Sequence, residues 1–245
     1  MKSCLVVDLG VIAYGRALEL QRRLAEARKA GATPDVLLLC EHPHVITLGR
    51  NGRREHLRVS EQLLARMGVE FHSTDRGGDI TYHGPGQQVG YPILHVGELR
   101  RDVGWYVRQL EEALIRAVAD LGVAARREPG LTGVWVDPRG GGGPEKLAAI
   151  GVHFSRWVST HGFACNVCTD LRYFDLIVPC GILGRGVTSL ERLLGRSVEL
   201  DEFRPRLIER FAEVYGFRME AAAPGRIDQL LETAGVAPAS LAAGT

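Results

Sequence analysis

The chain has 245 residues, 45% of them hydrophobic, and a formal net charge of +1 at pH 7. This length and composition predict a sizeable core, and the balanced charge argues against a protein that binds nucleic acid. We find no apolar run long enough to span a membrane and no secretory signal, and five irregularly spaced cysteines fit reduced thiols, so we expect a cytoplasmic protein.

In chain order, the sequence first predicts a strand at 4–8 and an amphipathic helix that ends near Gly31. Buried strands are expected at 36–40 and 45–48, then a short helix near 60–67 and a strand at 69–72. Residues 76–94 predict a glycine-rich turn followed by a strand. The apolar spacing between Val103 and Leu121 predicts the longest helix.

The second half predicts strands at 123–127, 133–137, 146–154 and 157–167, with a flexible glycine-rich loop at 138–144. Thr188 and Glu191 match a capping box for a short helix that Gly195 stops. The last strong helix is expected between Phe203 and Val214, followed by a weak helical stretch at 227–234.

Because strands and helices do not alternate strictly, we predict an α+β fold, a mixed sheet with helices packed on it. We see no linker that would divide the chain. The predicted organisation is one catalytic domain at 1–220 and an alanine-rich tail at 221–245 that is partly helical or frayed.

The densest motif is Arg76-Gly-Gly-Asp-Ile-Thr-Tyr-His83-Gly-Pro-Gly-Gln87. Its glycines allow the backbone to approach a ligand closely, and Arg76 and His83 could bind or polarise an acyl or carrier group. A tight hairpin whose glycines satisfy turn geometry is an equally good interpretation. The motif matches neither a P-loop nor the dinucleotide fingerprint.

Pro179-Cys180-Gly181 places a thiol beside a glycine, after the apolar run at 176–178. The glycine leaves the thiol uncrowded and can direct backbone N–H groups at a developing oxyanion, which suits a nucleophile. A small buried cysteine with only a packing role is the alternative.

Lysine is rare in this chain, with positions 2, 29 and 146 the only three among 30 basic residues. Lysine can release a proton and arginine cannot, so a lysine in such a chain can mark a place where proton transfer matters. Near a thiol, Lys146 would favour the thiolate and carry protons. A solvated lysine at the start of a strand is the alternative.

Metal binding has little support in the sequence. Cys165 and Cys168 resemble half of a zinc ribbon, but no second pair follows, and residues i and i+3 of a strand point to opposite faces. His42 and His44 lack an obvious third ligand, so we expect no metal.

The chain resembles the lipoyl(octanoyl) transferases, the octanoyl-carrier-protein:protein transferases of lipoate biosynthesis. The likeness extends from about residue 5 to about 215 and rests on six blocks in order: Glu41–Gly49, Arg76–Gln87, Gly133–Val136, Lys146–Gly151, His161–Ala164 with Asn166, and Pro179–Gly181. The glycine-rich loop before Lys146 is longer than the family pattern leads us to expect, and the alanine-rich end after residue 220 has no clear counterpart in it.

The resemblance implies a fold shared with lipoate and biotin protein ligases, and roles for particular residues. By this resemblance, Cys180 would be the acyl-thioester nucleophile and Lys146 the residue that favours its thiolate form. The acyl site that the family pattern implies consists of Arg76, Gly77, Gly78, Asp79, Ile80, Thr81, Tyr82, His83, Ala149, Ile150, Gly151, Gly162, Phe163 and Ala164. We further hypothesise that Gly77, Gly78, Gly151 and Gly162 open an apolar channel by lacking bulk.

The implied reaction is ping-pong, without ATP, metal or other cofactor. The donor is octanoyl on the phosphopantetheine of acyl carrier protein. The acceptors are lipoyl domains of 2-oxoacid dehydrogenase complexes and the glycine cleavage H protein. Acyl carrier proteins are acidic, so the arginine cluster at Arg50, Arg53, Arg54 and Arg58 is a candidate docking patch. We expect a monomer, without nucleic-acid or membrane partners.

Three other functions remain possible at this stage. An ATP-dependent lipoate or biotin ligase would share the fold but needs no cysteine nucleophile. A related amidotransferase would take octanoyl from one lipoyl domain to another. An inactive module that only holds acyl chains or lipoyl domains is disfavoured by the joint presence of Arg76, His83, Lys146 and Cys180.

Overall fold

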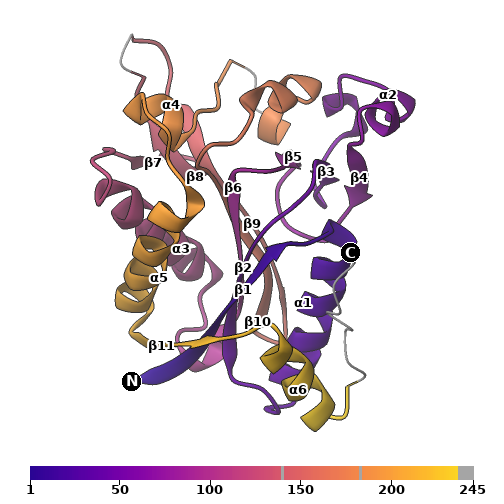
Figure 1. Cartoon of the computed structure of the whole chain (residues 1–245), viewed down its shortest axis with the longest axis vertical. Coiled ribbons are helices and arrows are strands. Elements are labelled where there is room, and N and C mark those ends of the chain that lie inside the picture. The colour runs from indigo at the N-terminus through magenta and orange to yellow at the C-terminus, as the bar shows by residue number, and fades with distance from the viewer. Residues whose placement is uncertain (139–140, 182–183, 237–245) are drawn as a thin grey trace.

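The computed structural model describes residues 1–138, 141–181 and 184–236, and Figure 1 shows how their elements are layered. Among these residues, eight strands form the main sheet, in the spatial order β11-β1-β2-β6-β10-β9-β8-β7. Their bounds are β1 Lys2–Val11, β2 Asp35–Glu41, β6 Gln87–Ile93, β7 Arg126–Glu128, β8 Leu131–Val136, β9 Glu145–Ser155, β10 Val158–Asn166 and β11 Phe217–Ala222. β1 runs parallel to β2 and β11, and the other neighbours are antiparallel. The predicted mixed sheet is therefore confirmed.

Helices cover both faces of this sheet (Figure 1). α3 (Val103–Ala119) and α5 (Leu200–Tyr215) lie on one face, and α1 (Tyr14–Lys29) and α6 (Gly225–Thr233) lie on the other. The shorter helices are α2 (Glu61–Arg66) and α4 (Leu190–Leu194), with 3₁₀ turns η1 (Arg54–His56), η2 (Val96–Glu98), η3 (Leu171–Leu176) and η4 (Pro179–Gly181). Every helix that the apolar spacing predicts is present.

β2 illustrates why the sequences of the strands at the centre of the sheet are continuously apolar. Leu37 and Leu39 point to the α3/α5 side, whereas Val36, Leu38 and Cys40 point to the α1/α6 side. Both faces are covered by helices, so both sets of side chains are buried and apolar.

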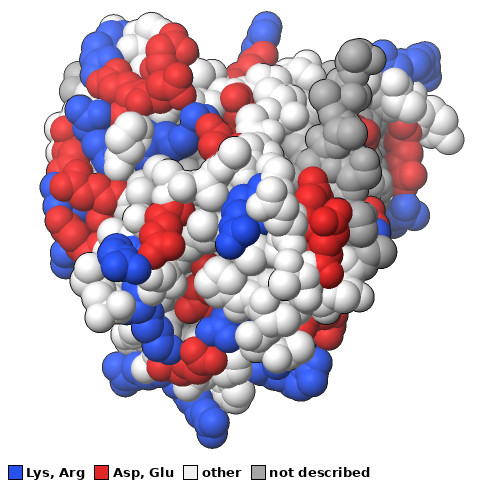
Figure 2. All heavy atoms as spheres, turned by 60° about the horizontal axis from the view of Figure 1, so that its bottom comes forward, with Lys and Arg blue, Asp and Glu red and all other residues white. Residues whose placement is uncertain are grey.

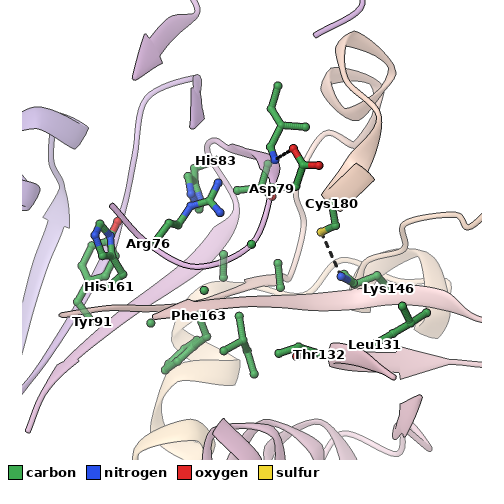
Figure 3. Close-up of a pocket in the computed structure, with 18 of the residues that line it drawn as sticks. Arg76, Asp79, His83, Tyr91, Leu131, Thr132, Lys146, His161, Phe163 and Cys180 are labelled. Atoms are coloured by element: carbon green, nitrogen blue, oxygen red, sulfur yellow. Dashed lines mark hydrogen bonds between the residues drawn. The ribbon is translucent and has the colours of Figure 1, made fainter. Parts of the chain in front are cut away.

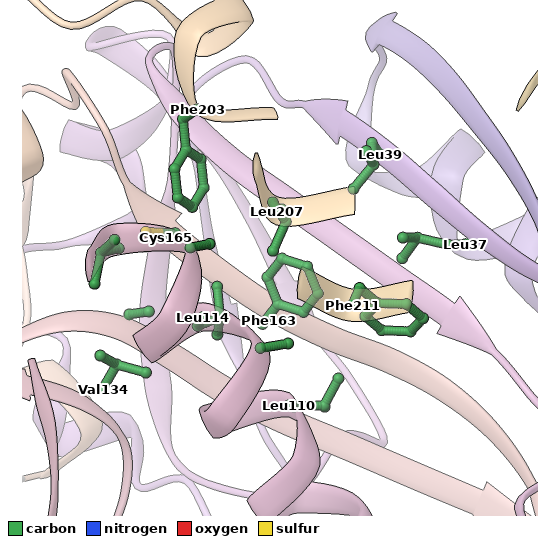
Figure 4. Close-up of a cluster of buried hydrophobic side chains, with 14 of the residues drawn as sticks. Leu37, Leu39, Leu110, Leu114, Val134, Phe163, Cys165, Phe203, Leu207 and Phe211 are labelled. Atoms are coloured by element: carbon green, nitrogen blue, oxygen red, sulfur yellow. The ribbon is translucent and has the colours of Figure 1, made fainter. Parts of the chain in front are cut away.

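The larger core lies between the sheet and the α3/α5 layer (Figure 4). Phe163 of β10 packs there among Leu110 and Leu114 of α3 and Leu207 and Phe211 of α5. These side chains repeat at helical spacing on each helix, which is why the sequence predicts α3 and α5 well.

A second sheet, with the order β4-β3-β5, stands beside the main one (Figure 1). Its strands are β3 (Val45–Leu48), β4 (Glu70–Ser73) and β5 (Ile80–His83). β5 belongs to the glycine-rich motif and pairs with β3, while β6, which follows it, pairs with β2 and β10 in the main sheet. The hairpin interpretation of this motif is therefore wrong, because the chain changes sheets at residues 84–86.

Three local predictions differ from the structure. The strand expected at 123–127 lies at Arg126–Glu128, and Ser189, rather than Thr188, accepts the capping bond of α4, from the Arg192 N–H at 3.2 Å. β11 was not predicted at all. It is stabilised by its pairing with β1, from Lys2 opposite Phe217 to Val7 opposite Ala222, more than by its own pattern.

β11 extends across residue 220, and the residues after it form α6, whose Ile227 and Leu231 are buried against the α1 side of the sheet. The helical stretch expected at 227–234 is thus present as α6. The division into a domain at 1–220 and a tail stays a prediction, and the tail's residues 237–245 lie outside the described residues, as do 139–140 of the glycine-rich loop.

Across the described ranges, no helix has both the length and the apolar character needed to cross a membrane. On the face shown in Figure 2, positive and negative side chains are interspersed. A charged docking site on this protein would therefore have to come from a local cluster, since net charge is only +1.

Candidate active site

A cavity of about 240 Å³ lies between the two sheets and brings together residues that are far apart in the chain (Figure 3). Cys180 and Lys146 lie at one end of it, and Tyr91 and His161 at the other. Of the predicted acyl-site residues it contains Arg76, Gly78, Asp79, Ile80, Thr81, His83, Ala149, Ile150, Gly151, Gly162, Phe163 and Ala164.

The nucleophile and the lysine meet directly. Lys146 Nζ donates a hydrogen bond to Cys180 Sγ at 3.1 Å. Lys146 is 7% exposed, and no ion pair within the described ranges includes it. The amine therefore lies in a desolvated site where its charge acts on the sulfur with little competition.

Cys180 lies in a 3₁₀ turn and has a φ of 55°, a left-handed conformation that is uncommon for a residue with a side chain. The chain is held on both sides of this turn. Before it, the Val178 N–H donates to the His56 carbonyl at 2.7 Å. After it, the Lys146 backbone bonds to Gly186 and Thr188, at 2.9 and 3.0 Å. The segment with the thiol is thus tied to the backbone of its partner lysine.

Asp79 supports the same turn rather than only lining the cavity. Its Oδ2 lies 2.6 Å from His56 Nδ1, and its Oδ1 accepts N–H bonds from Ile80 and Arg53 at 2.7 and 3.2 Å. Gly181 has a φ of 67°, and a Cβ there would approach Asp79 Oδ2 to 2.4 Å, so another residue after the nucleophile would strain the backbone and displace the Asp79–His56 pair. His56 is a residue of this site that the sequence analysis missed.

Arg76 is buried in the cavity wall. Its Nη2 donates to the carbonyl and the hydroxyl of Thr47 at 2.7 and 2.9 Å, and its Nη1 donates to the Gly77 carbonyl at 3.1 Å. Burial lowers the pKa of its guanidinium from the ordinary value. These bonds hold the 76–79 loop against β3.

His83 is buried and neutral. Burial lowers its pKa to about 3, and its Nδ1 lies 2.8 Å from Gln87 Oε1. The Gln87 amide donates to Tyr82 O and Asn166 Oδ1, so its oxygen accepts and His83 Nδ1 carries the proton. His83 Nε2 is therefore unprotonated and can accept a hydrogen bond.

The structure does not bring Gly77 or Tyr82 to the cavity. Successive side chains of β5 alternate between faces, so Tyr82 points away from the side of Thr81 and His83. It packs instead in the core of the smaller sheet, with its hydroxyl 2.7 Å from His44 Nδ1.

The glycines near the cavity have another role than the predicted one. A Cβ on Gly151 would lie 2.8 Å from the Gly77 carbonyl, and one on Gly162 would lie 2.2 Å from the Gly90 carbonyl. These positions are filled by neighbouring backbone, so the hypothesis of an open channel is wrong for them. The missing side chains allow segments of backbone to approach closely.

The cavity also has a lining that sequence reasoning missed: Tyr14, Tyr91, Gly130, Leu131, Thr132 and His161. Only His161 belongs to a block that carries the family resemblance. Its Nε2 lies 2.8 Å from Asp75 Oδ1, and burial lowers its pKa. Nothing in the local sequence marks Tyr14 or Tyr91, which reach the cavity from α1 and β6.

The possible metal ligands do not converge. His42 donates to the Ile12 carbonyl and accepts from the Tyr91 hydroxyl, both at 2.7 Å, while Cys165 is buried in the α3/α5 core. No group of three or more histidine, cysteine or acidic side chains in the described ranges could hold a metal ion.

His42 should make the fold sensitive to acid. Burial lowers its pKa to about 4, compared with about 6.5 in an unfolded chain. As pH falls below about 6.5, the unfolded chain takes up a proton that the folded protein refuses, so the free energy of unfolding falls towards pH 4. Between pH 7.5 and 5.0 we expect His42 to account for a loss of about 2 kcal/mol.

Urea denaturation at the two pH values measures this loss, with His42→Gln as the comparison because glutamine can keep both hydrogen bonds. The variant should show a smaller difference between pH 7.5 and pH 5.0. Equal pH dependence in both proteins would contradict the assignment of a neutral His42.

Comparison with known proteins shows which family this chain resembles in sequence. The sequence model described as the lipoyl protein ligase A/B catalytic domain matches residues 13–212. An octanoyltransferase from Solibacter usitatus is 54% identical over 219 residues, which cover 89% of this chain and 96% of that protein. One from Acidobacterium capsulatum is 56% identical over 193 residues, covering 76% and 78%.

Solved structures share the fold at low identity. A putative lipoate protein ligase from Thermoplasma acidophilum with bound lipoic acid has a TM-score of 0.71 and is 18% identical, covering 95% of this chain and 94% of that one. A lipoate-protein ligase A bound with ATP has a TM-score of 0.73, also at 18% identity, covering 95% and 93%. The predicted ligase-like fold is therefore confirmed.

Proposed function

The chain belongs to the family of lipoyl protein ligase A/B catalytic domains and is an acyltransferase of octanoyl groups, and from this premise we propose that it carries the octanoyl group as a thioester on Cys180. The observation that supports the proposal most is the 3.1 Å contact between Lys146 Nζ and Cys180 Sγ at one end of the cavity. A ligase that activates a free acid with ATP would need no such pair.

In the first half-reaction, the Cys180 thiolate attacks the carbonyl carbon of a thioester donor. The bond between that carbon and the donor sulfur breaks, and the departing thiolate takes a proton from the Lys146 ammonium. The protein then carries an octanoyl thioester, and Lys146 is neutral. One thioester has replaced another, so no ATP is consumed.

In the second half-reaction, the amine of an acceptor lysine attacks the same carbonyl carbon. An amide bond forms, the bond to Cys180 Sγ breaks, and Lys146 takes the proton that the amine loses. Cys180 and Lys146 return to thiolate and ammonium. The atoms and charges balance without a metal or another cofactor, and we propose that none takes part.

The acceptors are lipoyl domains, as the family implies. We propose that these are the lipoyl domains of 2-oxoacid dehydrogenase complexes and the glycine cleavage H protein. The proposed donor is octanoyl on the phosphopantetheine of acyl carrier protein. We place the reaction in the cytoplasm, because the mechanism needs Cys180 reduced, and all five cysteines are free thiols.

Mass spectrometry of the intact protein, mixed with octanoyl-carrier protein and no acceptor, tests the thioester, with Cys180→Ser as the control. We expect one octanoyl adduct that hydroxylamine removes, on the wild type alone. No adduct, with a loaded donor confirmed, would contradict the proposal. Activity that then required ATP would indicate a ligase, and activity with an octanoylated lipoyl domain as donor would indicate an amidotransferase.

The loop at residues 50–58 supports a docking site for an acidic carrier. Arg53 and Arg58 are exposed, and neither forms an ion pair within the part of the chain that the structure describes. The Arg53 N–H bonds to Asp79, which places this loop beside the turn of Cys180. By contrast, Arg54 pairs with Glu61, and Arg50 lies 2.7 Å from His153. We therefore propose that Arg53 and Arg58 receive the carrier.

The double variant Arg53→Glu/Arg58→Glu should raise KM for octanoyl-carrier protein by about tenfold, because it reverses two charges that attract an acidic partner. Octanoyl-pantetheine, which lacks the protein, should be used as well as before. Steady-state kinetics at low and high salt measure both effects, with Arg101→Glu, which reverses one exposed charge, as a control for charge reversal. An unchanged KM for the carrier would place its docking site elsewhere.

A further inference from the structure

The buried amine of Lys146 has an unusual partner, the aromatic ring of Trp135. Its Nζ has Cys180 Sγ as its hydrogen-bond partner, and it lies over the ring of Trp135, 4.7 Å from the centroid. The side chain is 7% exposed, and no carboxylate in the described ranges pairs with it. Trp135 belongs to the Gly133–Val136 block, to which the proposed mechanism assigns no role.

The ring of Trp135 is held in one place. It is 1% exposed, and its indole N–H donates to the Leu131 carbonyl at 3.2 Å. The pairing of β8 with β9 shifts register between Val134 and Trp135, directly after Gly133, whose φ is 121°. This irregularity turns β8 so that Trp135 pairs opposite Lys146.

The same irregularity makes room for the lysine. A Cβ on Gly133 would lie 3.5 Å from Lys146 Cε and 2.6 Å from the Ala148 carbonyl. The Gly133 N–H donates to the buried carboxylate of Glu111 on α3 at 3.0 Å, and Arg127 bonds the other oxygen of that carboxylate at 3.1 Å. The local backbone is thus fixed from the neighbouring helix.

A buried ammonium needs compensation, and the kind of compensation matters for the neighbouring thiol. A carboxylate would stabilise the ammonium but would also cancel its field at the sulfur. The face of an indole attracts a cation through its quadrupole, carries no net charge and takes no proton. With Trp135 as the partner, the full positive charge of Lys146 remains available to Cys180.

We propose that Trp135 is a positioning residue, whose indole face holds Lys146 as an ammonium beside Cys180 and thereby keeps Cys180 as the reactive thiolate. The proposal deepens the thioester mechanism and rests on it.

Other charged or titratable groups surround this pair from several elements. Glu145, on the strand of Lys146, lies 3.5 Å from Arg192 of α4, and Glu128 of β7 lies 3.5 Å from Arg185. Asp79 is bound by His56. The rest line the cavity with the pair: Tyr14, Arg76, His83, Tyr91 and His161. No hydrogen bond, ion pair or ring contact in the described ranges joins the Trp135 side chain to any of these groups, so a change confined to its ring isolates its contribution.

The test uses tryptophans with one to four ring fluorines, placed at position 135 in the full chain. Fluorine withdraws electron density from the ring face and is close to hydrogen in size, so the attraction weakens while the packing stays. The measurement is the rate of Cys180 alkylation by iodoacetamide as a function of pH, followed by peptide mass spectrometry to separate it from half-exposed Cys168.

We expect the midpoint of the alkylation profile to rise stepwise with fluorination, by about one pH unit over the series. The same series at Trp105, which packs edge-on against Tyr215, should leave the midpoint unchanged. A midpoint that stays constant across the folded Trp135 series would overturn the proposal. Trp135→Leu, which removes the ring, should show the largest shift, and Trp135→Phe an intermediate one.

This assay uses no octanoyl donor, so its outcome is separate from that of the thioester test. A shifting midpoint in a protein that forms no octanoyl adduct would retain the role of Trp135 and reject the transfer mechanism. An octanoyl adduct in a protein whose alkylation midpoint stays constant would support the transfer mechanism and reject the role of Trp135.

Discussion

Lys146→Arg should lower turnover by about a thousandfold, although it keeps a positive charge next to Cys180. Arginine does not release a proton in proteins, so it cannot serve the departing thiolate or take the proton of the incoming amine. Its planar guanidinium is also larger than the ammonium that fits between Cys180 Sγ at 3.1 Å and the Trp135 ring at 4.7 Å. Both the proton transfer and the placement of the cation between Cys180 and Trp135 are therefore impaired.

Separate measurements of the two half-reactions give this prediction its sharpest form. Lys146→Arg should retain part of the thiol's reactivity towards iodoacetamide, whereas Lys146→Met should lose it, because methionine removes the charge as well. Both variants should fail in aminolysis of a preformed octanoyl-protein. Lys29→Arg, which changes a lysine whose side chain is also 7% exposed but is paired with Glu26, is the matched control. Near-normal turnover of Lys146→Arg would contradict the relay.

Gly151→Val should lower turnover by about a hundredfold while the protein still folds. Even the first carbon of the new side chain would lie 2.8 Å from the Gly77 carbonyl and 3.2 Å from Arg76 Cδ. The Gly77 N–H bond to the Val152 carbonyl, 2.9 Å, holds the 76–79 loop on β9 and would be strained or broken. The loop would then move away from β9 and take Asp79 and the turn of Cys180 with it.

Turnover and thermal unfolding should be measured together for this variant. We expect a loss of about 1–3 kcal/mol in the free energy of unfolding, the usual range for overpacking. Gly225→Ala, at a position with no neighbour within 4 Å and no positive φ, should change neither quantity much. If Gly151→Val kept full turnover, the close approach of the loop to β9 would have no functional importance.

The elements that the sequence predicts well are those whose pattern is local. β2 is buried on both faces and therefore appears as an apolar run, and α3 and α5 repeat their buried side chains at helical spacing. β11 carries no such pattern, since Phe217–Ala222 contains one large buried residue, Phe217. Its strand conformation comes from β1, which lies at the other end of the chain.

The candidate site likewise combines residues that the local sequence reveals with residues whose roles depend on contacts elsewhere in the fold. Cys180, Lys146 and the glycine-rich motif carry recognisable local sequences. His56 and Tyr14 act through contacts with segments 23 or more residues away, as in the His56–Asp79 bond, and Trp135 acts through Lys146 on the neighbouring strand. The role of the glycines depends on which backbone lies opposite them, and Gly151 faces Gly77 only because the motif's loop folds onto β9. β5 and β6 belong to different sheets, and this too is decided by the whole fold and not by their local sequence.

The pairing of β1 with β11 has a consequence for how the protein is made. Phe217, the partner of Lys2, is synthesised 215 residues after it. At roughly 5–20 residues per second, the outer edge of β1 waits about 10–40 s for its neighbour. Until then it is an open strand edge that can pair with another nascent chain. On crowded polysomes, this protein would therefore be prone to misassembly at β1. Slower translation initiation in an expression host should then improve its yield.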